Sequence, residues 1–186
     1  MKLTLAFLIL AAASSAHAET AERGSRVVAS VAAGFGPKSA APKVTVREHA
    51  EDDGNLSLVI EGAHGMKLTN DNLISALERD EEDVSSYHVS TQVERGGGLR
   101  ISSVKDWGSN LWSYGYTVAF RDGGYHLARF EYKVSSRTKH GTCSLDLASG
   151  GAIVNGHETS FSVATDKIDR VDGIELERIC QSLGMN

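Results

Sequence analysis

The sequence predicts an α+β fold that consists mainly of an antiparallel β-sheet of roughly six to nine strands. Two observations predict it. Apolar and polar residues alternate with period two over most of residues 43–163, as they do in half-buried strands. Two short stretches, near 71–79 and 173–183, instead place apolar residues at helical spacing beside capping residues. We expect the second helix to pack on the sheet.

The N-terminus has the pattern of a secretory signal peptide. Lys2 supplies a positive charge, and residues 3–13 are an apolar run, shorter than the ~20 residues of a membrane span. The small-x-small pattern of residues 16–18 predicts cleavage after Ala18. The mature chain is therefore expected to be periplasmic or secreted, without a membrane span.

The next segment, residues 19–42, is rich in Ala, Gly and Ser and contains both prolines of the chain, Pro37 and Pro42. This composition favours a flexible arm, although the valines at 27, 28 and 31 leave a short strand or helical turn open. We expect one β-rich domain over residues 43–186.

The first part of this domain alternates as strands over 44–48 and 56–61, on either side of a turn of Asp, Gly and Asn. Asn70 then precedes a run in which Leu73, Ile74 and Leu77 share one helical side. Asn is a favoured N-cap, so this run predicts the short helix near 71–79.

The clearest hairpin joins residues 111–120 to residues 125–134 through a turn of Asp122, Gly123 and Gly124. One face of the first strand and one face of the second carry the apolar side chains, namely Trp112, Tyr114, Tyr116, Val118 and Phe120, then Ala128, Phe130, Tyr132 and Val134. An aromatic cleft for sugars or bases is one interpretation. Cross-strand aromatic pairs in a sheet core are the favoured one.

The two cysteines have positions that predict a structural disulfide. Cys143 alternates with polar neighbours on the apolar face of a strand, and Cys180 lies on the apolar stripe of the C-terminal helix. In an exported chain two cysteines allow one bridge. His140 near Cys143 leaves a nucleophile or metal corner as an alternative, but no protease or zinc spacing surrounds the pair.

Charge excludes two classes of partner. Cleavage after Ala18 removes one of 19 basic residues and none of the 24 acidic ones, which leaves a net charge of −6. A balance this acidic argues against nucleic acid and against an anionic membrane surface. No cofactor motif or metal-ligand spacing occurs in the sequence, so we expect neither a cofactor nor a metal.

The stretch of residues 105–112 provides the candidate contact surface, Trp107 and Asn110. An exposed loop Trp is a frequent interface anchor, although Trp107 folded over the sheet edge is an equal alternative. We therefore expect a non-catalytic periplasmic binding or interaction protein, such as an inhibitor of an envelope enzyme or an immunity-type protein. A small-molecule or glycan binder and an enzyme that uses His126, His140 and Asp146 are the alternatives.

Residues 112–156 resemble a pattern in small, uncharacterised exported bacterial proteins. The shared features are an aromatic strand, a DG turn, a return strand and the segment C-S-x-D-L-x-S-G. The resemblance implies a β-rich fold and assigns no active-site residue.

Overall fold

A computed structural model describes residues 25–32, 42–49, 56–62, 66–74, 86–95 and 97–185. In this part of the chain, eleven strands form two antiparallel sheets and one helix follows them. The prediction of a mainly antiparallel fold with a C-terminal helix is confirmed. The predicted count of six to nine strands is too low.

Both sheets are meanders, because hydrogen-bonded neighbours in each sheet are also consecutive in the chain. The smaller sheet contains β1 (Ser25–Ala32), β2 (Lys43–His49), β3 (Leu56–Glu61) and β4 (Lys67–Ile74). The larger sheet contains β5 (Ser86–Val93), β6 (Leu99–Trp107), β7 (Asn110–Arg121), β8 (Gly124–Ser135), β9 (His140–Asp146), β10 (Gly151–Val154) and β11 (His157–Ser160). The helix α1 spans Gly173–Ser182.

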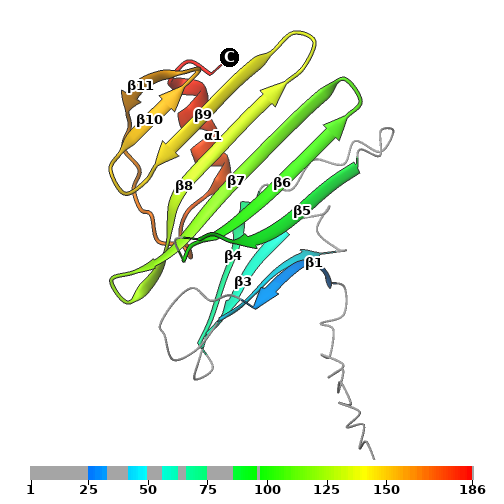
Figure 1. The fold of residues 1–186 in the computed structure, drawn as a ribbon, viewed down its shortest axis with the longest axis vertical. Helices are drawn as coiled ribbons and strands as arrows, with labels where there is room; N and C mark the ends of the chain where they lie inside the picture. The colour runs from blue at the N-terminus through cyan, green and yellow to red at the C-terminus, as the bar shows by residue number, and fades with distance from the viewer. Residues whose placement is uncertain are drawn as a thin grey trace, which may run out of the picture.

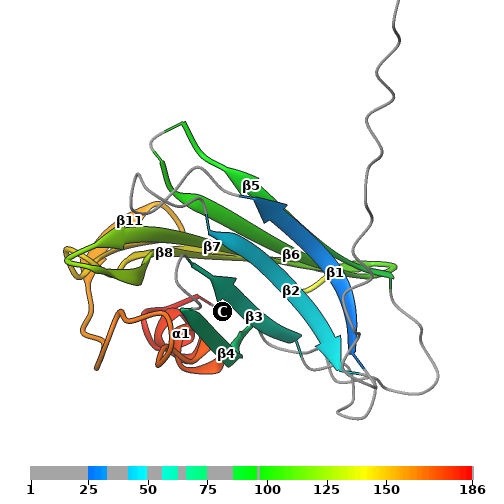
Figure 2. The same cartoon turned by 90° about the horizontal axis from the view of Figure 1, so that it is seen from below.

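The molecule has two layers. The larger sheet forms one layer (Figure 1), and the smaller sheet and α1 lie side by side on the same face of it (Figure 2). The helix contacts β4 at its side and packs on β8 and β9. At the other margin, β1 lies against β5. The helix thus extends the second layer where the smaller sheet ends, and this arrangement leaves an end of α1 near the ends of β7 and β8.

The predicted hairpin is present as β7 and β8, closed by Asp122 and Gly123 with φ of 50° and 77°. Positive φ at both central residues is the requirement of the two-residue turn that suits twisted strands. The pairing shifts after Thr117, which leaves Ala128 as an extra residue in β8. Because of this bulge, Leu127 is buried and Ala128 is only half-buried, so the predicted core position of Ala128 is wrong.

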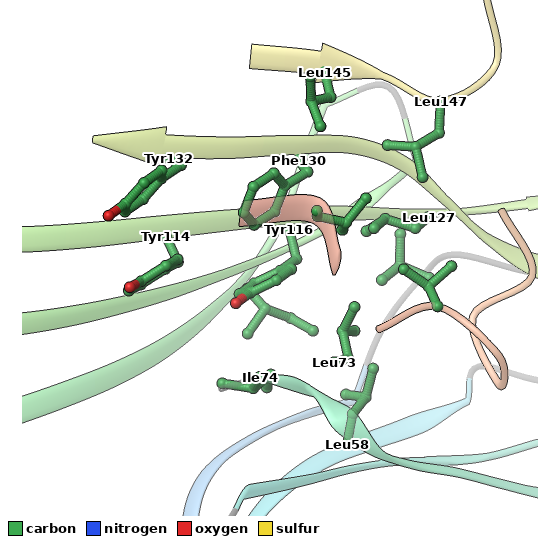
Figure 3. Close-up of a cluster of buried hydrophobic side chains, with 14 of the residues drawn as sticks. Leu58, Leu73, Ile74, Tyr114, Tyr116, Leu127, Phe130, Tyr132, Leu145 and Leu147 are labelled. Carbon is green, nitrogen blue, oxygen red and sulfur yellow. The ribbon is translucent and has the colours of Figure 1, made fainter. Parts of the chain in front are cut away.

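The core fills the space between the layers. Aromatic and aliphatic side chains of the larger sheet face Leu58, Leu73 and Ile74 of the smaller one (Figure 3). The predicted cross-strand aromatic pairs are present on β7 and β8. Ring centroids lie 5.0 Å apart for Tyr114 and Tyr132, 5.5 Å for Tyr116 and Phe130, and 5.1 Å for Phe120 and Tyr125.

The predicted helix near 71–79 is wrong where the structure describes it, because the chain continues in β4 to Ile74; residues 75–79 lie outside the described part. The side chain of Asn70 does accept a hydrogen bond from the Asn72 N–H at 2.8 Å, as a cap would. Its amide nitrogen, however, donates to the carbonyl oxygens of Ile168 and Val171, 2.8 Å away in the latter case. A tertiary contact therefore decides the conformation of this segment.

The expectation of a flexible arm over residues 19–42 also needs correction. Residues 25–32 form β1, which pairs with β2 along its whole length. A β-bulge between Val27 and Ala29 interrupts the alternation that would have marked the strand in the sequence. Residues 1–18, the predicted signal peptide, and the remainder of the arm up to residue 41 lie outside the described residues.

The C-terminal helix begins and ends at the predicted signals. Asp172 accepts hydrogen bonds from the N–H groups of Ile174 and Glu175, at 2.7 and 3.3 Å. Gly184, just after the helix, has a φ of 100°. At the first residue, Gly173 allows α1 to start directly against β4, since a Cβ there would overlap the Leu73 carbonyl oxygen.

Candidate functional site

A cleft of about 500 Å³ opens between α1 and the ends of β7 and β8. Four elements contribute its polar and apolar walls: Asn110 and Trp112 of β7, Tyr132 and Val134 of β8, Ser136, Thr138 and Lys139 of the following turn, and Glu177 and Gln181 of α1, with Met185 beyond the helix. Ligand sites of proteins have this size, and they too combine aromatic and apolar walls with a few polar groups.

Glu177 is the acceptor at the inner wall of this cleft. The hydroxyl of Tyr114 donates to Glu177 Oε2 at 3.3 Å, and Gln181 Nε2 donates to Glu177 Oε1 at 3.1 Å. Tyr132 stacks on Tyr114 beside this pair, and the negative charge of Glu177 acts on its hydroxyl. The two tyrosine rings are stacked, 15° from parallel, and their hydroxyls point the same way (Figure 3).

The two tyrosines of this cluster remain protonated in ordinary conditions. Burial is the main cause that raises the pKa of Tyr114 and Tyr132 far above the usual value, and the negative charge of Glu177 raises each pKa further. The Tyr114 hydroxyl is therefore a donor, and together with Gln181 Nε2 it holds the carboxylate of Glu177 through both of its oxygens.

Trp112 forms the aromatic wall. The ammonium nitrogen of Lys105 lies 5.6 Å from the centroid of the Trp112 ring, within range of a cation–π contact. Lys105 is directly opposite Trp112 in the ladder of β6 and β7, and the residue is only 8% exposed. The lysine thus helps to fix the indole while the ring still lines the cleft.

The cysteine pair holds α1 in the place that this cleft requires. The sulfurs of Cys143 and Cys180 lie within disulfide distance, and their Cα atoms are 5.8 Å apart. Cys180 directly precedes Gln181 and lies within one helical turn of Glu177. The bridge therefore connects β9 of the larger sheet to the part of α1 that contributes Glu177 and Gln181 to the cleft.

The two predicted contact residues belong to a tight turn. Trp107 is the last residue of β6 and pairs with Asn110, the first of β7, across Gly108 and Ser109. Gly108 has a φ of 60°, which explains a two-residue turn in place of the expected loop. Asn110 lines the cleft, whereas the side chain of Trp107 lies outside the described parts of the structure.

The three residues of the enzyme alternative do not converge. His140 and Asp146 begin and end the same strand, β9, which separates them by about 20 Å at ~3.3 Å per residue. His140 Nδ1 lies 3.3 Å from Ser135 Oγ. His126 Nδ1 lies 3.0 Å from Asp166 Oδ1, and Arg121 also pairs with that carboxylate. Asp166 thereby connects the segment before α1 to β8.

Asp146 has a local structural partner. Burial acts to raise its pKa, but hydrogen bonds from the backbone N–H groups of Ser149 and Ala148 outweigh burial, so the pKa of Asp146 lies below its usual value. Stabilising the turn between β9 and β10 accounts for this carboxylate.

The sequence did not indicate Glu177, Gln181 or Lys139 as site residues. The only local signal is the spacing of Glu177 and Gln181, four residues apart and hence neighbours on a helix surface. Among the described residues, no group of three His, Cys, Asp or Glu side chains could hold a metal ion. The described part also contains no helix that is long and apolar enough to cross a membrane.

Comparisons with known proteins give no relative for this chain: no family model, no curated protein and no solved structure matches it.

Proposed function

We propose that the protein is an exported, non-catalytic binding protein whose ligand occupies the cleft between α1 and the ends of β7 and β8. The carrying observation is the cleft itself, in which an aromatic wall faces a fixed carboxylate and several amide and hydroxyl groups. This combination provides apolar contact area together with directional hydrogen bonds, as small-molecule sites do.

The fixed state of the lining favours binding. Glu177 receives hydrogen bonds from Tyr114 and Gln181, and Lys105 lies over Trp112. Side chains that are already ordered lose little conformational entropy when a ligand arrives. His126 pairs with Asp166 and Asp146 accepts hydrogen bonds within its own turn, so neither side chain is directed at the other or at the cleft lining.

Export to a bacterial periplasm is part of the proposal. It is supported by the signal-peptide pattern of residues 1–18 and by a cysteine pair at disulfide distance, which is compatible with an oxidising compartment.

A protein partner is the second candidate, because the tight turn that contains Trp107 adjoins the cleft through Asn110. A partner bound at this turn, such as an envelope enzyme that the protein inhibits, would be able to insert a side chain into the cleft. Trp107→Ala should then weaken capture of the partner and leave the melting temperature nearly unchanged. A large fall in melting temperature would assign Trp107 to the core and remove this candidate.

The test fills the cleft. Gln181→Trp places a bulky ring in its mouth, whereas Ser182→Trp places the same ring about 100° further around the helix, outside the lining. Each variant is exported in a bacterium and recovered from the periplasm for native mass spectrometry and for pull-down. We expect Gln181→Trp to lose a bound molecule that wild type and Ser182→Trp retain. Equal retention by all three proteins would refute the proposed site.

A further inference from the structure

We infer that the ligand of this cleft is a neutral carbohydrate, bound as a single substituted sugar ring against Trp112. The inference rests on the proposed function and specifies its ligand. It is argued from the charge, the hydrogen-bonding capacity and the size of the cleft.

The charges of the lining give no net attraction to a ligand with a single charge. Glu177 presents a carboxylate and Lys139 an ammonium group to the same space. A cationic ligand is attracted by Glu177 and repelled by Lys139, and an anionic ligand experiences the reverse. Such a ligand therefore gains little to offset the loss of its hydration, whereas a neutral ligand has no charge to desolvate.

The polar groups of the lining differ in what they offer. Glu177 only accepts hydrogen bonds and Lys139 only donates them, whereas the amides of Asn110 and Gln181 and the hydroxyl of Thr138 do both. A ligand hydroxyl also does both, so a ring with several hydroxyls can pair with every one of these groups. A protonated amine, which only donates, or a ketone or ether, which only accepts, would leave some of them unpaired.

The apolar groups and the volume suit a sugar ring. Trp112, Tyr132, Val134 and Met185 supply an aromatic and aliphatic wall, on which the C–H face of a pyranose can stack. At the ~30 Å³ that each water-sized group occupies in a liquid, 500 Å³ holds on the order of 15 non-hydrogen atoms. That is the size of one sugar ring with a substituent.

The experiment compares matched neutral and charged sugars. Methyl glycosides of glucose, galactose, mannose, N-acetylglucosamine and N-acetylgalactosamine are titrated into the mature protein by calorimetry. Glucosamine, glucuronate and galacturonate serve as charged counterparts with the same rings. At least one neutral glycoside should bind at least about tenfold more tightly than its charged counterparts, which corresponds to one hydrogen bond lost or to hydration of the charge that the cleft does not replace.

Variants then locate the binding. Gln181→Leu keeps the volume of the side chain but removes the amide, so it should weaken the neutral glycoside about tenfold, whereas Ser182→Ala should not weaken it. Circular dichroism checks that both variants are folded. Tighter binding of a charged sugar, or no binding of any neutral glycoside, would overturn the inference. If the wild-type protein carries a non-sugar ligand that Gln181→Trp loses, the inference is overturned but the proposed site stands. Only equal retention of the bound molecule by the wild-type protein and Gln181→Trp would refute the site itself.

Discussion

Reduction of the bridge between Cys143 and Cys180 should destabilise the protein strongly and should affect α1 first. The two residues are separated by 37 positions, and closing a loop of this length restricts the unfolded chain by about 4 kcal/mol at 25 °C in the chain-entropy model. Both side chains are almost fully buried. Water therefore does not reach the two sulfur atoms, and reduction gives the thiols no new contact with water in the folded state.

The measurement is urea unfolding of the wild-type protein with and without a reductant, followed by circular dichroism. At a urea dependence of ~2 kcal/mol per M, a loss of about 4 kcal/mol lowers the unfolding midpoint by about 2 M. The variant Cys143→Ala/Cys180→Ala, measured without reductant, is the control for effects of the reagent. Its midpoint should fall similarly, since each change removes the same bond.

Hydrogen exchange locates the effect. Among the described residues the helix packs mainly on β4 of the smaller sheet and on β8 and β9 of the larger one, and the bridge adds a covalent connection to β9. In the reduced protein the amides of 173–182 should exchange faster, while those of β7 and β8 stay protected. An unchanged midpoint, or a helix that stays as protected as the central strands, would show that packing alone holds α1. Two free thiols in unfolded, unreduced material from the periplasm would refute the bridge itself.

Three further predictions concern other parts of the chain. Burial first, and then the charge of Glu177, raise the pKa of Tyr114, so this tyrosine ionises near pH 10 in the unfolded state but stays protonated in the native state. The free energy of unfolding should therefore fall above about pH 10, by ~1.4 kcal/mol per pH unit for each such tyrosine. Tyr114→Phe should reduce this slope in urea titrations at pH 9 to 11. A slope that Tyr114→Phe leaves unchanged would contradict this account. Asn70→Ala should lower the free energy of unfolding by about 2 kcal/mol, because two buried carbonyl oxygens lose their donor, whereas the exposed Asn72→Ala should change it little; equal effects would contradict the role of Asn70. The intact mass of exported protein should correspond to a chain that begins at Glu19, and periplasmic material that retains Met1 would disprove the predicted cleavage.

Much of the larger sheet could be predicted because its signals are local. Alternation over β7 and β8 and the Asp122-Gly123 turn depend on residues that are close in the sequence, so the hairpin was predicted correctly. The cap at Asp172 and the positive φ at Gly184 are equally local, and α1 follows its prediction. Two of the failures occur at bulges, in β1 near Val27 and in β8 at Ala128, where one extra residue changes the face on which side chains lie.

The sequence by itself determined the β-rich class, the helix α1, and the placement of Cys143 and Cys180 on the apolar faces of a strand and of that helix. These features follow from periodicity and capping, which act within a few residues. Only the tertiary structure decided that Asn70 reaches the backbone of Val171, so that the chain continues as β4 where a helix was expected. Only the tertiary structure also brought Glu177 to Tyr114, 63 positions earlier in the chain. Such contacts depend on how layers pack, and a linear pattern carries no information about which surfaces meet.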